Sequence, residues 1–177
     1  RLNPSNVTVP AGRRYLPGTM VLETTWGTRT GWVIVRDVLL IGRARTMRAH
    51  AGQPAFPGGA PDPGDADAAA AALREAREET GLDPTGVRVF GGLPDLWVPV
   101  SGFVVSPVLG WWERPTPVAP MDPAEVSSVH RIPIDDLVAP TNRCRVRHPS
   151  GYVGPGFEVD GLLVWGFTAG LLNGVLE

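Results

Sequence analysis

Three glutamates lie close together in residues 73–82, which read LREAREETGL. In a helix, residues three and four positions apart share a face, so Glu75, Glu78 and Glu79 are predicted to converge. Arg74 precedes Glu78 by four residues and is expected to hydrogen-bond its carboxylate and fix its orientation. A hard divalent cation relieves the repulsion in such a cluster, and Mg²⁺ or Mn²⁺ prefers oxygen ligands. The spacing therefore predicts a metal site that could bind a polyanion.

The helix that must position these side chains is predicted at residues 67–80. Asp65 or Asp67 can accept the free N–H groups of its first turn, and the alanine run at residues 68–72 has high helix propensity. Gly81 supplies the left-handed residue that commonly ends a helix. Local sequence alone therefore specifies both ends of the element.

The segment before this helix, residues 43–64, loses apolar periodicity and gains glycine and proline, which predicts a long loop. A loop of this length inside a compact domain is usually functional or disordered. It contains the sequence FPGG at residues 56–59, and two adjacent glycines let the backbone approach a ligand closely and leave carbonyl groups available to it. We expect this loop to line the same site as the glutamates.

Together, the loop and the helix resemble the Nudix box: a Gly, five residues, a Glu, seven residues, then Arg-Glu-apolar-X-Glu-Glu-X-Gly-apolar. Residues 73–82 match this form, with Ala76 as a small apolar residue. Upstream of them, Asp65 stands in place of the glutamate, and eight residues rather than seven separate it from Arg74. The coenzyme A diphosphatase branch commonly carries this Asp and this longer spacing, so the departure is typical of that branch.

A second motif, immediately before the box, resembles the same branch. Its form is an Arg, three residues, a Gly, three residues and Phe-Pro-Gly-Gly, and residues 48–59 read RAHAGQPAFPGG. Residues 39–40 provide its leading apolar pair, and residues 101–108 and 164–170 also look like this branch. The resemblance favours substrate binding by Arg48, His50 and Gly58, since an arginine offers a two-pronged donor to a phosphate.

The resemblance implies attack of water on one phosphorus of coenzyme A, which gives 4′-phosphopantetheine and adenosine 3′,5′-bisphosphate. The implied ligands of Mg²⁺ or Mn²⁺ are three carboxylates and one carbonyl group: Glu75, Glu78, Glu79 and Gly59. Arg74 would orient Glu78. The family draws its general base from the box in some members and from a later loop in others, and Glu125 is the candidate for a late-loop ligand or base. The expected catalytic residues are Arg74, Glu78, Glu79 and Glu125.

The fold implied by the resemblance is the α/β Nudix fold, a mixed β-sheet sandwiched between α-helices in a single domain. Residues 1–30 are predicted to be an irregular N-terminal segment, and residues 31–177 the Nudix hydrolase domain. Residues 31–41 suggest a hairpin or a bent strand. Further elements are expected in this order: strands at 87–90, 103–111 and 126–133, a short helix at 134–138, and a helical stretch at 162–176.

Bulk composition excludes some partners. A formal net charge of −2 gives no general attraction to nucleic acid or to an anionic membrane, and no apolar run approaches the length of a membrane span. The single cysteine, Cys144, fits a reducing compartment and is expected to be inert, so a cytoplasmic location is the default expectation. The expected partner is a small-molecule substrate, and a homodimer is left open.

Other functions fit part of this pattern. The metal helix is equally compatible with a Nudix hydrolase of ADP-ribose, NADH or an oxidised nucleotide. A non-catalytic nucleotide sensor is a further alternative, although it would be favoured by loss of one of the three glutamates. The glutamates could also form a solvated helix face, as most charge runs do. A second basic cluster could bind phosphate or be merely solvated: Arg143, Arg145, Arg147 and His148.

Overall fold

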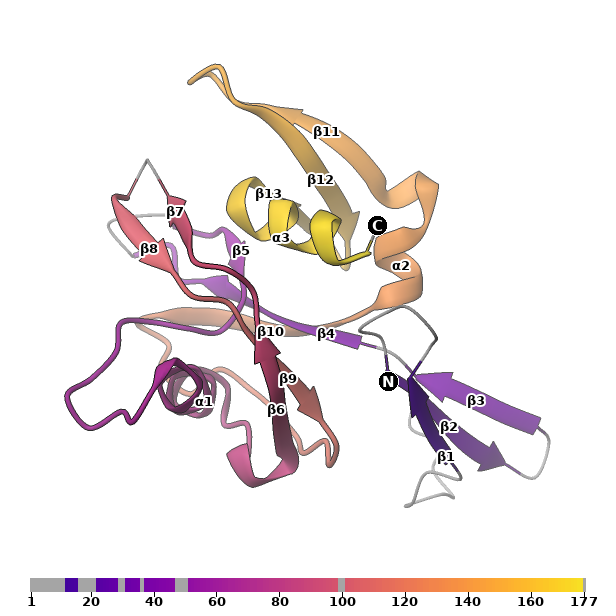
Figure 1. The fold of residues 1–177 in the computed structure, drawn as a ribbon. Helices are drawn as coiled ribbons and strands as arrows, with labels where there is room; N and C mark the ends of the chain where they lie inside the picture. The colour runs from indigo at the N-terminus through magenta and orange to yellow at the C-terminus, as the bar shows by residue number, and fades with distance from the viewer. Residues whose placement is uncertain are drawn as a thin grey trace. The chain divides into compact units, whose positions relative to one another are not determined.

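The structure is a computed structural model that describes residues 12–15, 22–28, 31–35, 37–46, 51–98 and 101–176, with side-chain burial from residue 37 onward. Contacts divide the chain into two compact units. Figure 1 labels the helices and strands of the chain. One unit comprises residues 1–38 and 131–177, and the other comprises residues 39–130. The glutamate helix, the double glycine and Glu125 therefore all belong to the second of these units.

The unit of residues 39–130 contains the glutamate helix together with several short strands. The strands β4 (Asp37–Arg43), β5 (Pro54–Ala55) and β10 (Val126–Pro133) form a three-stranded sheet in the order β10-β4-β5. Two antiparallel pairs follow: β6 (Val87–Gly92) with β9 (Val108–Trp112), and β7 (Leu96–Val98) with β8 (Phe103–Val105). The fully buried Leu40, Ile41 and Val126 anchor the three-stranded sheet in the core.

The helix α1 (Ala68–Thr80) begins and ends where the sequence predicts. Asp67 is the N-cap, and its carboxylate accepts a hydrogen bond from the Ala70 N–H at 2.8 Å. Gly81 adopts a left-handed conformation with φ of 69°, and its N–H donates to the Arg77 carbonyl. Each end of the helix is thus capped by a local hydrogen bond. Because the helix ends are fixed in this way, the three glutamates lie in its last two turns.

The C-terminal part of the other unit, residues 131–177, has its own sheet and helices. The strands β11 (Arg143–Arg147), β12 (Val153–Val159) and β13 (Leu162–Trp165) are antiparallel in that order, and α3 (Gly166–Leu176) packs on β12 and β13. The helix α2 (Ile134–Val138) precedes them. Phe157, Val164 and Ala169 are fully buried between sheet and helix. Among the helices that the structure describes, none combines the length and the apolar character needed to cross a membrane.

The prediction that residues 1–30 are irregular is wrong for the part that the structure describes. The strands β1 (Gly12–Tyr15), β2 (Leu22–Thr28) and β3 (Gly31–Val35) form an antiparallel three-stranded sheet. The threonines and Trp26 of β2 have good strand propensity, because β-branched and aromatic side chains fit a pleated surface whether or not the stretch is apolar. The domain boundary that we place at residue 30 stays a prediction.

Two predicted elements differ in detail. The expected strand at 103–111 is divided into β8 and β9 by Ser106 and Pro107, since a proline cannot donate to a strand ladder. The expected helical stretch at 162–176 begins as a strand, β13, which pairs with β12, and Gly166 at φ of 66° starts α3. Residues 31–41, where a hairpin or a bent strand is expected, instead contribute to two strands in different sheets, β3 and β4.

Candidate functional site

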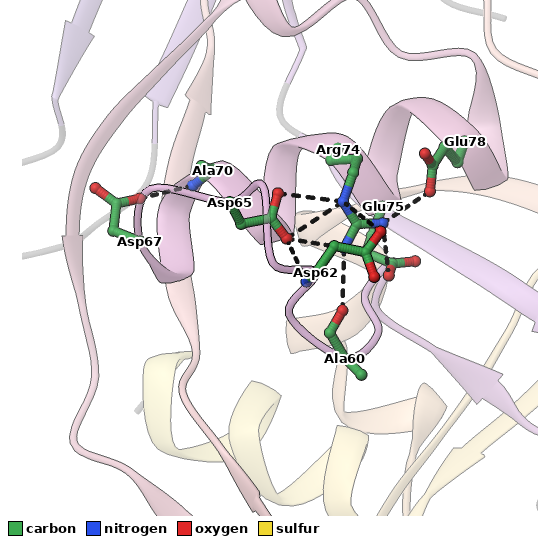
Figure 2. Close-up of polar contacts among 8 residues, drawn as sticks. All are labelled: Ala60, Asp62, Asp65, Asp67, Ala70, Arg74, Glu75 and Glu78. Atoms are coloured by element: carbon green, nitrogen blue, oxygen red, sulfur yellow. Dashed lines mark hydrogen bonds and ion pairs between the residues drawn. The ribbon is translucent and has the colours of Figure 1, made fainter.

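Arg74 is the centre of a polar network between α1 and the preceding loop (Figure 2). Its Nε lies 3.2 Å from Asp65 Oδ1 and its Nη2 lies 3.0 Å from Asp65 Oδ2. Nη1 donates to Glu75 Oε1 at 3.0 Å and to Glu78 Oε2 at 2.8 Å. Nη2 also donates to the Ala60 carbonyl at 3.0 Å. One side chain therefore ties the loop to two of the helix carboxylates.

Arg74 and Asp65 each stabilise the charged form of the other. The hydrogen bond from Arg74 is the main cause that holds the pKa of Asp65 below its usual range. The same hydrogen bond is the largest cause that raises the pKa of Arg74 further above its ordinary value. Asp65, which stands where the Nudix box usually has a glutamate, is thus the hydrogen-bond partner with the largest effect on the pKa of Arg74.

Glu79 points in a different direction from Glu78. The residue Glu79 is only 5% exposed, and its Oε2 accepts a hydrogen bond from the Gly58 N–H at 2.9 Å. The Glu78 side chain is 59% exposed and pairs with Arg74. The buried glutamate is therefore the one that contacts the double-glycine loop.

The buried position of Glu79 changes its acidity. Burial raises the pKa of Glu79 to about 7, and the hydrogen bond from Gly58 partly opposes this rise. The negative charges of Glu75 and Glu125 raise the pKa further, while the positive charge of Arg43 lowers it. Glu79 therefore lies within electrostatic reach of two other carboxylates and one cation.

This acidity predicts the pH dependence of metal-free stability. In the unfolded chain Glu79 ionises near 4.5, whereas in the folded protein it keeps its proton until about 7. Between these values the folded state binds more protons, so we expect stability to fall as pH rises from 4.5 to 7 and to level off above. After discounting for solvent screening, the loss is about 1 to 2 kcal/mol. Urea unfolding with EDTA across this range measures it, and an equal slope in Glu79→Gln would contradict it.

Glu125 lies in the short segment that leads into β10. Its N–H and that of Val126 donate to the Asp122 carbonyl at 3.1 and 2.8 Å, and its own carbonyl accepts from the Ala44 N–H at 2.7 Å. These bonds fix the backbone of Glu125 beside the end of β4. The side chain is exposed, and its charge acts on Glu79. The late-loop candidate thus shares one electrostatic environment with Glu75 and Glu79. We use the term carboxylate cluster for these three residues together with Glu78, which Arg74 links to Glu75.

Gly59 lies against the Glu75 carboxylate. A Cβ atom at this position would overlap the carboxylate of Glu75, which Arg74 holds in place. We therefore expect Gly59→Ala to displace Glu75 and to lower kcat/KM by about 10- to 100-fold, the effect typical of disturbing the support of a metal ligand. The matched control is Gly64→Ala, where an added Cβ meets no heavy atom within 4 Å. Steady-state kinetics that show equal activity for the two variants would contradict this role of Gly59.

The donor atoms of the site fit a hard divalent cation. As the side chains stand, no group of three or more His, Cys, Asp and Glu residues within the described ranges is placed to hold a metal ion. The reason is visible at Arg74, which pairs with both Glu75 and Glu78. Glu78 is exposed and can rotate, and all candidate donors are oxygens, which Mg²⁺ and Mn²⁺ prefer. The coupled charges of Glu75, Glu79 and Glu125 are those that a cation would neutralise.

The remaining residues singled out in the sequence lie elsewhere. Arg48 and His50 fall outside the residues that the structure describes. The second basic cluster lies in the other compact unit, on and just after β11. There the Arg143 guanidinium lies 5.4 Å from the centre of the Phe157 ring, and His148 stacks on Trp165 with ring centres 5.2 Å apart. These two contacts hold parts of that cluster within their own unit.

Arg43 is a residue of the site that the sequence reasoning missed. It is the last residue of β4, and its charge reaches Glu79. The signal available in the sequence was a cation that ends an apolar strand directly before the glycine-rich loop. Without knowing that β4 ends beside Glu125, this pattern does not distinguish a site residue from a solvated strand end.

The comparison with known families assigns the class of the protein. A family model described as the NUDIX domain matches residues 28–149, more than half of the chain. The match includes α1, the glycine loop and Glu125, and it spans segments of both compact units. The chain therefore belongs to the Nudix hydrolase family, and the predicted α/β Nudix fold is confirmed.

Several bacterial relatives carry one name. A protein of Cronobacter sakazakii named "Uncharacterized Nudix hydrolase NudL" is 39% identical over 143 residues, which cover 77% of this chain and 71% of the relative. Proteins of the same name from Citrobacter koseri and Escherichia coli K12 are also 39% identical over 143 residues. Nudix hydrolases act on diphosphate bonds of small molecules and generally use divalent metal ions, so this chain is an enzyme of that class. These names specify no substrate.

Proposed function

We propose that this enzyme hydrolyses the diphosphate bond of coenzyme A or its derivatives to 4′-phosphopantetheine and adenosine 3′,5′-bisphosphate, with Mg²⁺ or Mn²⁺. The main support for metal-dependent hydrolysis of a diphosphate is the environment of the buried Glu79. Its carboxylate accepts a hydrogen bond from the Gly58 N–H and lies within reach of the charges of Glu75 and Glu125. The choice of coenzyme A rests on the motif at residues 48–59 and on Asp65 with its longer spacing.

The residues proposed to hold the metal are Glu75, Glu78, Glu79 and the Gly59 carbonyl. A bound divalent cation would neutralise charge that develops on the phosphoryl oxygens and lower the pKa of water in the site. Arg74 positions Glu75 and Glu78, because its Nη1 donates to both carboxylates. Gly58 positions Glu79 through its N–H.

Glu125 is proposed as the general base. Its backbone is fixed by hydrogen bonds to Asp122 and Ala44, and its side chain is exposed, so a water could reach it. In the reaction the water oxygen bonds to one phosphorus while the bond from that phosphorus to the bridging oxygen breaks. The water proton passes to the Glu125 carboxylate, and the bridging oxygen leaves with the other phosphate.

A different Nudix substrate is equally compatible with the site. ADP-ribose, NADH and oxidised nucleotides all contain a diphosphate or triphosphate, and the carboxylate cluster would act on any of them. A sensor that binds nucleotide without turnover is less favoured, since all three box glutamates are present. Binding of the substrate by Arg48, His50 and Gly58, a homodimer and a cytoplasmic location stay predictions.

A substrate panel separates these alternatives. We would incubate the protein with coenzyme A, ADP-ribose, NADH and 8-oxo-dGTP, each with Mg²⁺, with Mn²⁺ or with EDTA, and separate the products by chromatography. Metal-dependent release of adenosine 3′,5′-bisphosphate, with the highest kcat/KM for coenzyme A, is the expected result. Preference for another substrate would remove coenzyme A and keep the hydrolase. Nucleotide binding without any product would favour the sensor.

A further inference from the structure

The backbone around Arg43 links the two segments that flank the carboxylate cluster. On one side, the Arg43 N–H donates to the Gln53 carbonyl at 3.1 Å, and the Gly52 N–H donates to the Arg43 carbonyl at 3.0 Å. These bonds tie the end of β4 to the strand β5, which leads directly into the glycines before α1. The position of Arg43 is thus fixed relative to the glycine loop.

On the other side, the same point of the chain is tied to the segment of Glu125. The Ala44 N–H donates to the Glu125 carbonyl at 2.7 Å. The Ser127 hydroxyl donates to the Gly42 carbonyl at 3.0 Å. The residue before Arg43 and the residue after it are therefore both held by the chain around Glu125, which fixes the backbone from which the Arg43 side chain extends. The charge of that side chain reaches Glu79.

The side chain of Arg43 has hydrogen-bonding capacity that the described protein atoms do not use. Its Nε is buried and has no hydrogen-bond partner within the part of the chain that the structure describes. A buried donor without a partner is costly, so the Nε of Arg43 calls for an acceptor that the described protein atoms do not supply. Arg74 is the opposite case, since its guanidinium is taken up by Asp65, Glu75 and Glu78.

We propose that Arg43 is a substrate-binding residue, whose guanidinium donates hydrogen bonds to a phosphoryl oxygen of the diphosphate bound at the carboxylate cluster. The inference rests on the proposed function, because it takes the cluster as the place where a diphosphate is cleaved. A planar guanidinium presents paired donors that match a phosphate. Arg74 cannot do this without releasing its carboxylates. Arg43 therefore supplies the positive charge that a polyanion needs at a site lined by glutamates.

Binding of a non-hydrolysable diphosphate tests this role directly. The variants are Arg43→Met, which keeps the length of the stem, and Arg43→Lys, which keeps the charge. Methylene diphosphonate, titrated by calorimetry in saturating Mn²⁺, should bind about 10- to 100-fold more weakly to Arg43→Met and to an intermediate degree to Arg43→Lys. Mn²⁺ affinity without diphosphonate should not fall in either variant. The matched control is Arg45→Met, an exposed arginine two residues further on, which should bind like the wild type.

Several outcomes would overturn the proposal. One is wild-type affinity for the diphosphonate in Arg43→Met, or no binding of it by the wild type. Another is a parallel loss of Mn²⁺ and diphosphonate affinity, which a purely structural role would produce. If Arg43→Met does not fold, Arg43→Lys provides the test. Unchanged affinity of Arg43→Lys for the diphosphonate overturns the proposal. A loss of that affinity by about 3- to 10-fold at unchanged Tm supports it.

Failure of this proposal can be distinguished from failure of the proposed function. If the wild type binds Mn²⁺ and the diphosphonate but hydrolyses no substrate in the panel, the function fails, and the Arg43 variants still test the binding role. If the wild type turns over a substrate while Arg43→Met keeps kcat/KM within about 2-fold, only the role of Arg43 fails.

Discussion

Glu79→Gln is expected to lower kcat/KM by about 10²- to 10³-fold and, in metal-free protein at pH 8, to stabilise the fold by about 1 to 2 kcal/mol. Activity falls while stability rises because the negative charge of Glu79 is needed to bind the metal but destabilises the metal-free fold. The Glu79 carboxylate is a proposed metal ligand, yet it is buried near the charges of Glu75 and Glu125. Glutamine keeps the shape and the acceptor for the Gly58 N–H but removes the charge.

The measurements are steady-state kinetics with metal and urea unfolding with EDTA at pH 8. The matched control is Glu158→Gln, the same substitution at an exposed position of β12, which should change neither property. A Glu79→Gln protein that is inactive and also less stable than the wild type would contradict the account, since it would indicate that glutamate is required for folding. Full activity would remove Glu79 from the site.

Arg74→Met is expected to lower kcat/KM by about 100-fold and to lower Tm. The substitution releases the carboxylates of Glu75 and Glu78 and leaves the Asp65 side chain, which is only 9% exposed, without its cation. Arg74→Lys should recover only part of both losses, because one ammonium group cannot reproduce the fork that reaches the loop and the helix together.

Kinetics and thermal unfolding check this prediction, with Arg77→Met as the control one helical turn away. Arg77 is exposed on the same helix, and within the described residues its side chain makes no hydrogen bond or ion pair. Its replacement should leave kcat/KM within about 3-fold. Equal effects of the two substitutions would mean that Arg74 contributes only its charge and does not position the glutamates.

Much of α1 and its surroundings could be predicted because the signals are local. An Asp N-cap, an alanine run and a left-handed glycine determine the helix ends without help from the rest of the chain. The spacing of Arg74 and Glu78 likewise predicts their ion pair, which the structure contains at 2.8 Å. The strand at Val126–Pro133 and the helix at Ile134–Val138 were also predicted with their observed bounds.

The features that could not be predicted depend on contacts between distant segments. Helical spacing groups Glu75, Glu78 and Glu79, but only the fold decides that Glu79 is buried against Gly58 while Glu78 is exposed. The β12 sequence VGPGFEV contains glycines and a proline that disfavour a strand. Pro155 nevertheless lies opposite Arg145 in the β11–β12 ladder, whereas β13 pairs with β12 only from Gly156 onward, so β12 is a strand because of its two neighbours rather than its own propensity.

The role of Arg43 could not be predicted from the sequence for the same reason. Its sequence context is an ordinary strand end, and its proximity to the cluster follows from bonds to Gln53 and from the bond between Ala44 and Glu125. These pairs are separated along the chain by loops whose path the local pattern does not specify. Residues whose roles depend on such long-range bonds therefore have to be found in the structure.

The most direct test of the central claim is titration of Mn²⁺ into metal-free protein at pH 8, followed by the loss of the free-ion signal in electron paramagnetic resonance. The wild type and Glu158→Gln should bind Mn²⁺ saturably with equal affinity, and Glu79→Gln should bind at least about 10-fold more weakly. Such a result would identify the carboxylate cluster as a divalent metal site. Equal binding by all three proteins, or none by the wild type, would contradict it.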